Sequence, residues 1–188
     1  MPRAGPTSAI VAFTAHHAIA ADVAEDQLRG RLPPDDLGAP MSASFQLFLA
    51  GWVGAEPGPH DVVLALPPGA ARATPVDLEA ADTLGDHRRV QRASRYRSNL
   101  TVWTDPSGAG VLVVGRGLAV RWEMAFEVDD AARGRGLGRR LAAAAGAVVP
   151  DGDIVFAQVS PGNVASLRAV LAAGYRPIAS EVLFTPRP

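Results

Sequence analysis

The chain has 188 residues, 48% of them hydrophobic, and a formal net charge of −1 at pH 7. This length and apolar content suffice for one globular domain with a sizeable core. The near-neutral charge gives no general attraction for nucleic acid. The absence of cysteine excludes disulfides, thiolate catalysis and thiolate metal sites. The four histidines are scattered without metal-site spacing, so we expect no metal.

No apolar run reaches the length of a membrane span, and the N-terminus lacks the pattern of a signal peptide. We therefore expect a soluble, cytoplasmic protein that binds neither a membrane nor nucleic acid. All 18 basic residues are arginine, which we attribute to a GC-rich coding bias and not to function.

The N-terminal half predicts alternating strands and helices. Their expected ranges are a strand at 10–15, helices at 20–32 and 42–53, a strand at 61–66 and a helix at 76–93. Two Gly/Pro-rich stretches, 54–60 and 67–75, are expected to be loops. The helix at 42–53 carries large apolar residues at helical spacing, which favours core packing over a ligand-binding role.

The C-terminal half predicts more strands. A hairpin is expected from strands at 100–104 and 110–114 around a turn at 105–108, followed by a third strand at 122–128. An Ala-rich helix at 141–149 ends at Pro150. A strand at 154–159, a helix after Asn163 and closing strands at 176–178 and 181–184 complete the order.

The most informative stretch joins the strand at 122–128 to the Ala-rich helix. Its glycines, Gly134, Gly136 and Gly138, permit tight turns and leave space for a ligand close to the backbone. The first N–H groups of a helix lack intrahelical partners and lie at the positive end of its dipole. The loop also carries several arginines. Together these features predict an anion site, with phosphate as the first candidate.

The spacing of the loop narrows the ligand. A P-loop requires lysine, which this chain lacks, and Arg139 stands where a dinucleotide fingerprint places its third glycine. The spacing Arg-x-x-Gly-x-Gly at Arg133, Gly136 and Gly138 resembles the acetyl-CoA loop of the GNAT superfamily of N-acetyltransferases. The alternative from the loop alone is an ordinary strand-to-helix turn with solvated arginines.

A second motif follows at the distance typical of GNAT chains. A strand leads to Asn163, a small residue follows at Ser166, and a short helix ends in Gly174 and Tyr175. The resemblance covers residues 99–184 and implies a GNAT-like α/β (α+β) fold, with a mixed, mainly antiparallel sheet flanked by helices. Two central strands splay apart to admit the pantetheine arm. We expect residues 1–188 to form one such domain with an atypical N-terminal half, 1–98, although a separate small subdomain is an alternative.

The resemblance implies acetyl-CoA as cosubstrate, with its pyrophosphate on the loop amides and its arm near Asn163. The expected cofactor-binding residues are Val128, Arg133, Gly134, Arg135, Gly136, Leu137, Gly138, Arg139, Asn163 and Ser166. Five arginines lie between 88 and 97. They suit the 3′-phosphate of CoA or an acidic acceptor, but we favour a solvated helix face paired with Asp82 and Asp86.

The catalytic residues are harder to assign. The usual tyrosine acid of the family falls at Val170, which leaves Tyr175 and Ser166 as nearby substitutes. Glu123 and Glu127 share one face of the strand at 122–128, and burial would raise their pKa values toward a range useful for a general base. They are equally well read as structural groups, paired with arginines such as Arg121 or Arg116.

Two functions remain open. The first is an N-acetyltransferase that moves acetyl from acetyl-CoA to a primary amine of a small molecule or peptide. The second is a catalytically weak GNAT-like module that binds or senses acyl-CoA, which the valine at position 170 favours. The oligomeric state is open, and a homodimer is one option.

Overall fold

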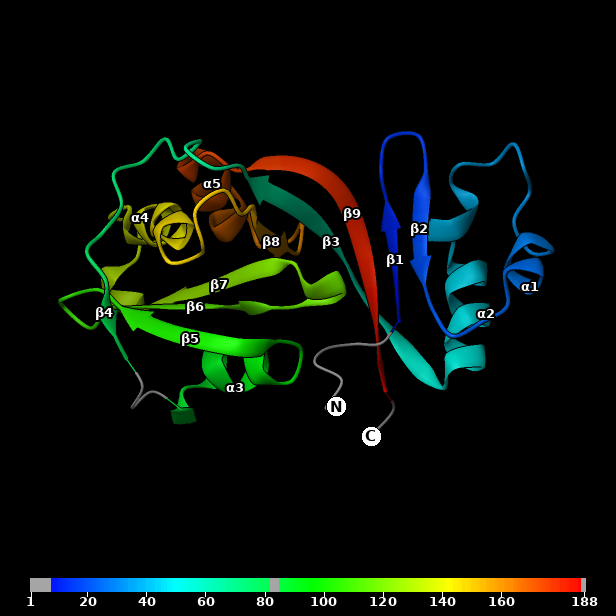
Figure 1. Cartoon of the computed structure of the whole chain (residues 1–188), viewed down its shortest axis with the longest axis horizontal. Helices are drawn as coiled ribbons and strands as arrows, with labels where there is room; N and C mark the ends of the chain where they lie inside the picture. Colours follow the sequence, from blue (N-terminus) through cyan, green and yellow to red (C-terminus); the bar gives the residue numbers. More distant parts are fainter. Residues whose placement is uncertain (1–7, 82–84, 187–188) are drawn as a thin grey trace. The chain divides into compact units, whose positions relative to one another are not determined.

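The computed structural model describes residues 8–81 and 85–186. Within these ranges, nine strands form a mixed sheet in the order β2-β1-β9-β3-β8-β7-β6-β5-β4 (Figure 1). The described chain divides into two compact units, one with residues 63–81 and 85–177 and the other with 8–62 and 178–186. These boundaries differ from residue 98, where we expected the atypical N-terminal half to end. The single GNAT-like domain stays a prediction.

The smaller unit contains β1 (Ser8–Ala12), β2 (His17–Ala20), α1 (Glu25–Arg29), α2 (Ala43–Val53) and parts of β3 (Ala55–Leu66) and β9 (Arg176–Pro186). Strand β1 pairs in antiparallel fashion with both β2 and β9. Helix α2 starts where the Ser42 hydroxyl accepts the N–H of Phe45 at 3.3 Å. Phe45 and Leu49 on α2 pack against Ile10 and Phe184 in the core of this unit.

Several sequence predictions for this unit are wrong in their bounds. The strand expected at 10–15 is β1, which ends at Ala12 because the N–H of Phe13 closes a turn onto the carbonyl of His16. The helix expected at 20–32 shrinks to α1, and β2 occupies the residues before it.

The loop expected at 54–60 is instead the first half of β3. A Cβ at Gly58 would lie 3.0 Å from the carbonyl oxygen of Leu183. The glycine therefore permits a close approach of two strands here and does not interrupt the strand.

The larger unit contains the remaining elements. They are β4 (Glu79–Ala80), α3 (Arg88–Ser94), β5 (Ser98–Thr104), β6 (Gly110–Arg116), β7 (Trp122–Val128), α4 (Leu137–Ala144), β8 (Val155–Val159) and α5 (Val164–Ala173). Strands β5, β6 and β7 are antiparallel, and β7 runs parallel to β8. Helix α3 packs on β5, β6 and β7, and α4 packs on β6, β7 and α5.

Helices α3 and α4 cover opposite faces of these strands. Val111 and Val113 of β6 pack against α3. A Cβ at Gly110 would collide with Leu141 of α4, at 2.7 Å from its Cδ1 atom. Because neighbouring residues of a strand point to opposite faces, odd and even residues of β6 meet different helices. Residues of β7 alternate in the same way.

Two helix predictions for this unit need correction. The helix expected at 76–93 includes residues 82–84, which lie outside the described residues. Its described part holds β4 and then α3, which starts at Arg88 because His87 Nδ1 accepts the N–H of Arg89 at 3.1 Å. The Ala-rich helix begins at Leu137 and passes into a 3₁₀ turn at Ala145–Ala147.

The strand predictions around the loop are closer. Strand β7 occupies the expected range 122–128 and β8 covers all but one residue of 154–159. The two closing strands are one continuous strand, β9. In the described ranges, no helix combines the length and the apolarity needed to cross a membrane.

Candidate functional site

The loop between β7 and α4 has the backbone conformation that its glycines suggested. Gly134 and Gly136 adopt positive φ angles of 76° and 82°, which favour glycine. Gly138 has a packing role, because a Cβ there would lie 2.8 Å from Cε2 of Phe126. Glycine at this position therefore lets the first turn of α4 lie directly against β7.

The loop presents a row of unused hydrogen-bond donors. Within the described part of the chain, six consecutive backbone N–H groups donate to no acceptor: those of Gly134, Arg135, Gly136, Leu137, Gly138 and Arg139. The last three belong to the first turn of α4, where the helix dipole is positive. This arrangement can bind an anion with several phosphate oxygens.

The arginines of the loop divide into two kinds. Arg133 folds back onto its own loop, where its Nε donates to the carbonyl of Val128 at 3.1 Å and its Nη2 pairs with Asp130 at 2.7 Å. Arg135 and Arg139 are exposed and form no ion pair among the described residues. Arg133 thus shapes the loop, and the other two remain free to bind a phosphate.

Strands β7 and β8 part beside this loop. Their parallel ladder has only two residue pairs, Trp122 with Val155 and Glu123 with Phe156. Beyond these pairs both strands continue, β7 to Val128 and β8 to Val159, without pairing to each other. We call the place where pairing stops the fork. The splayed strands expected from the resemblance are therefore present.

The free backbone groups of β7 face the fork. The N–H of Asp129 donates to the carbonyl of Ala109 at 2.9 Å, on the β6 side. In an antiparallel ladder, successive residues direct their backbone groups to opposite sides. The N–H groups of Phe126 and Val128 therefore point toward β8, where no ladder partner meets them.

Two side-chain contacts agree with this direction. Nη2 of Arg97 lies 3.5 Å from the carbonyl oxygen of Met124, and Arg133 reaches the carbonyl of Val128. Both carbonyls belong to even residues of β7, as the alternation requires.

Asn163 and Ser166 lie at the start of α5. The Asn163 side chain accepts the N–H of Ser166 at 3.2 Å through Oδ1 and so caps the helix. The Nδ2 group of Asn163 makes no hydrogen bond within the described residues. It is therefore available to an outside ligand, and its role in cofactor binding stays a prediction.

Glu123 is held by two arginines. Its Oε2 accepts from Arg97 Nε at 3.0 Å, and its Oε1 accepts from Arg121 Nε at 2.8 Å. Oε1 also accepts the N–H of Leu118 at 3.2 Å. Of the two arginines named from the sequence, Arg121 is thus the partner, whereas Arg116 pairs with Asp153. These contacts give Glu123 a structural role, and its catalytic role stays a prediction.

Glu127 binds the start of α3. Burial acts to raise the pKa of its carboxyl, but the hydrogen bond from Arg88 and the charges of Arg88 and Arg89 outweigh it and hold the pKa below the ordinary 4.5. Burial thus acts in the expected direction, but the expectation that the pKa of Glu127 would rise toward the range of a general base is wrong. A lowered pKa makes Glu127 a weaker base than an ordinary glutamate.

This ion pair has a consequence for stability against acid. Because the pKa of Glu127 is lowered in the folded state, its stabilising contribution is present above about pH 4.5 and is lost as the pH falls through the lowered value. We expect Glu127→Gln to be less stable than the native chain at neutral pH. Its free energy of unfolding should also decline less between about pH 5 and pH 2. Urea titrations of both proteins at each pH measure these free energies. An equal decline in the native chain and in Glu127→Gln would contradict the prediction.

Tyr175 lies in the core against α4. Its side chain is 2% exposed, and its hydroxyl donates to the carbonyl of Ala142 in α4 at 3.1 Å. Burial raises the pKa of this hydroxyl above its ordinary value. Val170 is also fully buried. Both observations favour core roles, and an acid role for Tyr175 stays a prediction.

The arginines between 88 and 97 were expected to form a solvated helix face, but three of them pair with carboxylates of β7. Arg88 and Arg89 pair with Glu127, and Arg97 pairs with Glu123. Asp82, one of the expected partners, lies outside the described residues. The position of Arg97 has no local sequence signal, because its partners lie 26 and more residues away along the chain.

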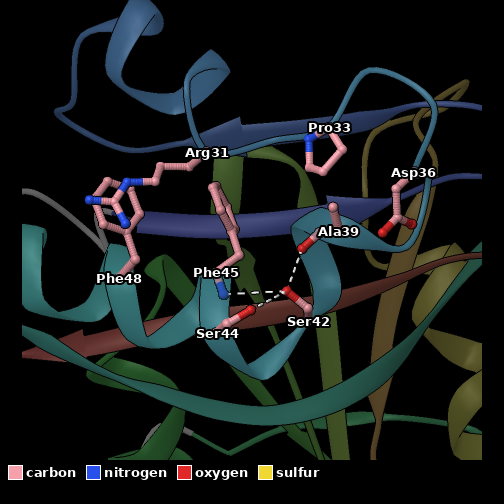
Figure 2. A pocket seen from close by; sticks show the side chains of 8 residues that line it. All are labelled: Arg31, Pro33, Asp36, Ala39, Ser42, Ser44, Phe45 and Phe48. Carbon is pink, nitrogen blue, oxygen red and sulfur yellow. Dashed lines mark hydrogen bonds between the residues drawn. The ribbon is translucent and has the colours of Figure 1, made fainter.

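The described residues contain no group of three or more His, Asp or Glu side chains placed to hold a metal ion. The smaller unit does contain a pocket of about 320 Å³ at the start of α2 (Figure 2). Arg31 lies over the ring of Phe48, 4.6 Å from its centroid. Ser42 caps α2, and its hydroxyl donates to the carbonyl of Ala39. Phe45 and Phe48 therefore line the pocket and also pack in the core of this unit. We assign the pocket no ligand.

Several solved structures resemble the chain, and two of them illustrate the similarity. One is a GNAT-family acetyltransferase from Colwellia psychrerythraea, with 12% identity and a TM-score of 0.50 over 77% of this chain and 62% of that chain. The other is a GCN5-related N-acetyltransferase from Kribbella flavida, with 17% identity and a TM-score of 0.52 over 76% of this chain and 64% of that chain. The chain thus spans less than two thirds of either structure.

No family model matches the chain, and no curated protein matches it. The fold therefore rests on the solved structures and on the sheet, whose strands part beside a glycine loop and helix. On this evidence, the chain has the fold of the GNAT acetyltransferases.

Proposed function

We propose that this chain is a GNAT acyltransferase that binds acetyl-CoA and transfers its acetyl group to a primary amine. The observation that carries the proposal is the row of six free N–H groups from Gly134 to Arg139, adjacent to the fork between β7 and β8. The row suits a pyrophosphate, and Arg135 and Arg139 add charge. The fork gives an extended arm a path along the unpaired groups of β7.

The chain's own groups fit the acyl-transfer step. Acetyl-CoA supplies a thioester, whose carbon–sulfur bond breaks as the amine nitrogen bonds to the carbonyl carbon. The N–H groups of Phe126 and Val128 face the fork and can donate to the negative charge that develops on the carbonyl oxygen. They are fixed by the β6–β7 ladder before the substrate arrives, so little reorganisation is required.

The chain offers fewer groups for proton transfer than for binding the thioester. The attacking amine must lose protons, and the departing thiolate gains one. Glu127 has a lowered pKa, and Glu123 is engaged by two arginines. We therefore propose that water, and not a carboxylate of the chain, removes the proton.

A specific observation favours a second candidate, a CoA-binding module with little turnover. Val170 stands at the family's tyrosine position and is fully buried, and the hydroxyl of Tyr175 is used by Ala142. Neither side chain offers an acid to the departing thiolate. The cytoplasmic location and the homodimer stay predictions under either candidate.

Calorimetric titration with CoA and acetyl-CoA tests the cofactor, and CoA release with a panel of primary amines tests the transfer. Binding with steady, amine-dependent release supports the enzyme. Tight binding without release for any amine supports the binding module. Lack of binding of both CoA and acetyl-CoA would overturn the proposal.

Tyr175 can be tested separately. We expect Tyr175→Phe to lower the free energy of unfolding by about 0.5–1.5 kcal/mol, because the carbonyl of Ala142 loses its donor. The rate of CoA release should stay within about twofold of the native rate, since the hydroxyl points into the core. A variant that keeps native stability but loses release by about 100-fold would instead assign Tyr175 the acid role.

A further inference from the structure

Helix α3 lies along β7 on one face of the fork. Its first residue, Arg88, donates to Glu127, which lies beyond the paired positions of β7, at the open end of the fork. Arg97 follows the helix and contacts Glu123, at the last paired position, and Gln158 on β8. The helix therefore runs antiparallel to β7, from the open end of the fork to its closed end. An acceptor that reaches the fork from this face lies beside α3.

The side of α3 that faces away from the sheet is a row of arginines. Val90 and Ala93 are the buried residues of the helix and pack toward the sheet. Arg88, Arg92 and Arg95 recur at i, i+4 and i+7, so they lie along the opposite side. All three are exposed. We call these three residues the α3 basic row, and a partner can reach it without any movement of the chain.

Positive charge is concentrated on this helix. Arg88 and Arg89 share the single carboxylate of Glu127. Arg92 and Arg95 form no ion pair in the described part of the chain. Burial lowers the pKa of the Arg89 guanidinium, and the nearby charge of Arg92 adds to this effect against the opposing charge of Glu127. The arginines are thus close enough to repel one another.

The acidic residues near the helix do not balance this charge. None lies on α3 itself. Asp130 acts on Arg88 through its charge, but it is exposed and already pairs with Arg133. Asp86 precedes the helix, is exposed and forms no ion pair with the row. The arginines outnumber these acids, so the outer side of α3 attracts negatively charged partners.

We propose that the α3 basic row is a docking surface for an acidic polypeptide segment that carries the acceptor amine. The inference rests on the proposed function, because that function brings an amine to the fork. From Arg88 to Arg95 the helix rises by about 10 Å, which about three residues of an extended chain can span. A peptide whose amine enters the fork can therefore place acidic side chains over the row a few positions along its chain.

An acidic polypeptide fits the row better than other anions do. Nucleic acid requires a wider basic surface, whereas the row occupies one short helix in a chain with a net charge of −1. A single small anion would use only part of a row that extends along the helix. A chain with successive acidic side chains can meet all of it.

The test uses the full chain saturated with CoA and two short peptides that each have a free α-amino group. Glutamates follow the first residue in one peptide, and glutamines follow it in the other. We expect calorimetry to give about 10-fold tighter binding of the glutamate peptide at low salt. The difference should largely disappear at about 0.5 M salt, because exposed charges are then screened. With acetyl-CoA, the same preference should appear in KM, with kcat within about twofold.

Arg92→Gln combined with Arg95→Gln should remove most of this preference and leave affinity for CoA within about twofold. Both side chains are exposed, so the fold should persist by circular dichroism. Arg72→Gln combined with Arg176→Gln is the matched control. It removes the same charge from exposed positions of the same unit that lie outside α3. The control should keep the preference.

Equal binding of the two peptides, or a preference that survives loss of Arg92 and Arg95, overturns the docking surface while the proposed function stands. A preference that the control loses equally would assign it to net charge and also overturn the surface. Tighter binding of a single-stranded oligonucleotide of equal charge would assign the row to nucleic acid instead. Preferential peptide binding without CoA release would keep the surface and overturn the transfer. A failure to bind CoA and both peptides overturns both proposals.

Discussion

Replacing Gly136 with valine is expected to weaken CoA binding by about 100-fold or more in a protein that remains folded. Gly136 has a φ angle of 82°, which is strongly unfavourable for a β-branched residue. Relief of this strain must rotate the peptide groups on either side. The six free N–H groups from Gly134 to Arg139 would then change direction relative to one another. Because each hydrogen bond to a charged phosphate contributes about 1.5–3 kcal/mol, loss of two accounts for the expected change.

Gly152→Val provides a matched control. Gly152 has a similar φ angle of 87°, lies in the same unit and has no atom within 4 Å of an added Cβ. Its turn precedes β8 and is separate from the glycine loop. Both variants should lose about 1–2 kcal/mol of folding free energy from backbone strain. Only Gly136→Val should lose CoA, as measured by calorimetry with circular dichroism to confirm the fold. Native affinity in that variant would refute the assignment of the pyrophosphate to this loop.

The sequence predicted the local backbone of the glycine loop and the cap of α5 better than it predicted the elements around them. Gly134 and Gly136 need positive φ angles, and Asn163 caps a helix. These requirements are local and can be read from a few neighbouring residues. The range of β7 was likewise clear, because an apolar run leads directly into the loop.

The errors concern features set by distant contacts. Residues 54–60 are rich in glycine and proline, yet they form half of β3 because Gly58 permits close contact with Leu183. Arg97 was placed on a solvated helix face, whereas it binds Glu123 and Gln158 across the sheet. Neither pairing has a local signature, since strand partners and ion pairs are chosen by the folded topology.

The largest expected effect on stability comes from Glu123→Ala, which should lower the free energy of unfolding by about 3–5 kcal/mol. The substitution removes the carboxylate that Arg97 and Arg121 share, and it leaves the guanidinium of Arg97 without its ion-pair partner, although the two arginine side chains are only 11% and 15% exposed. It also removes the acceptor of the Leu118 N–H. An unpaired buried charge accounts for most of the expected loss. Arg97→Met in the Glu123→Ala background should therefore recover part of the stability.

Glu25→Ala is the matched control, because the pair of Glu25 with Arg29 has side chains that are 75% and 77% exposed. Exposed pairs contribute about 0–1 kcal/mol, so this variant should unfold almost as the native chain does. Urea titration compares the two variants directly. A stability loss at Glu123 together with unchanged CoA release in the folded fraction would establish a structural role. If Glu123→Gln instead kept native stability and lost release by about 100-fold, Glu123 would be the general base, because loss of a proton acceptor slows the chemical step without a loss of stability.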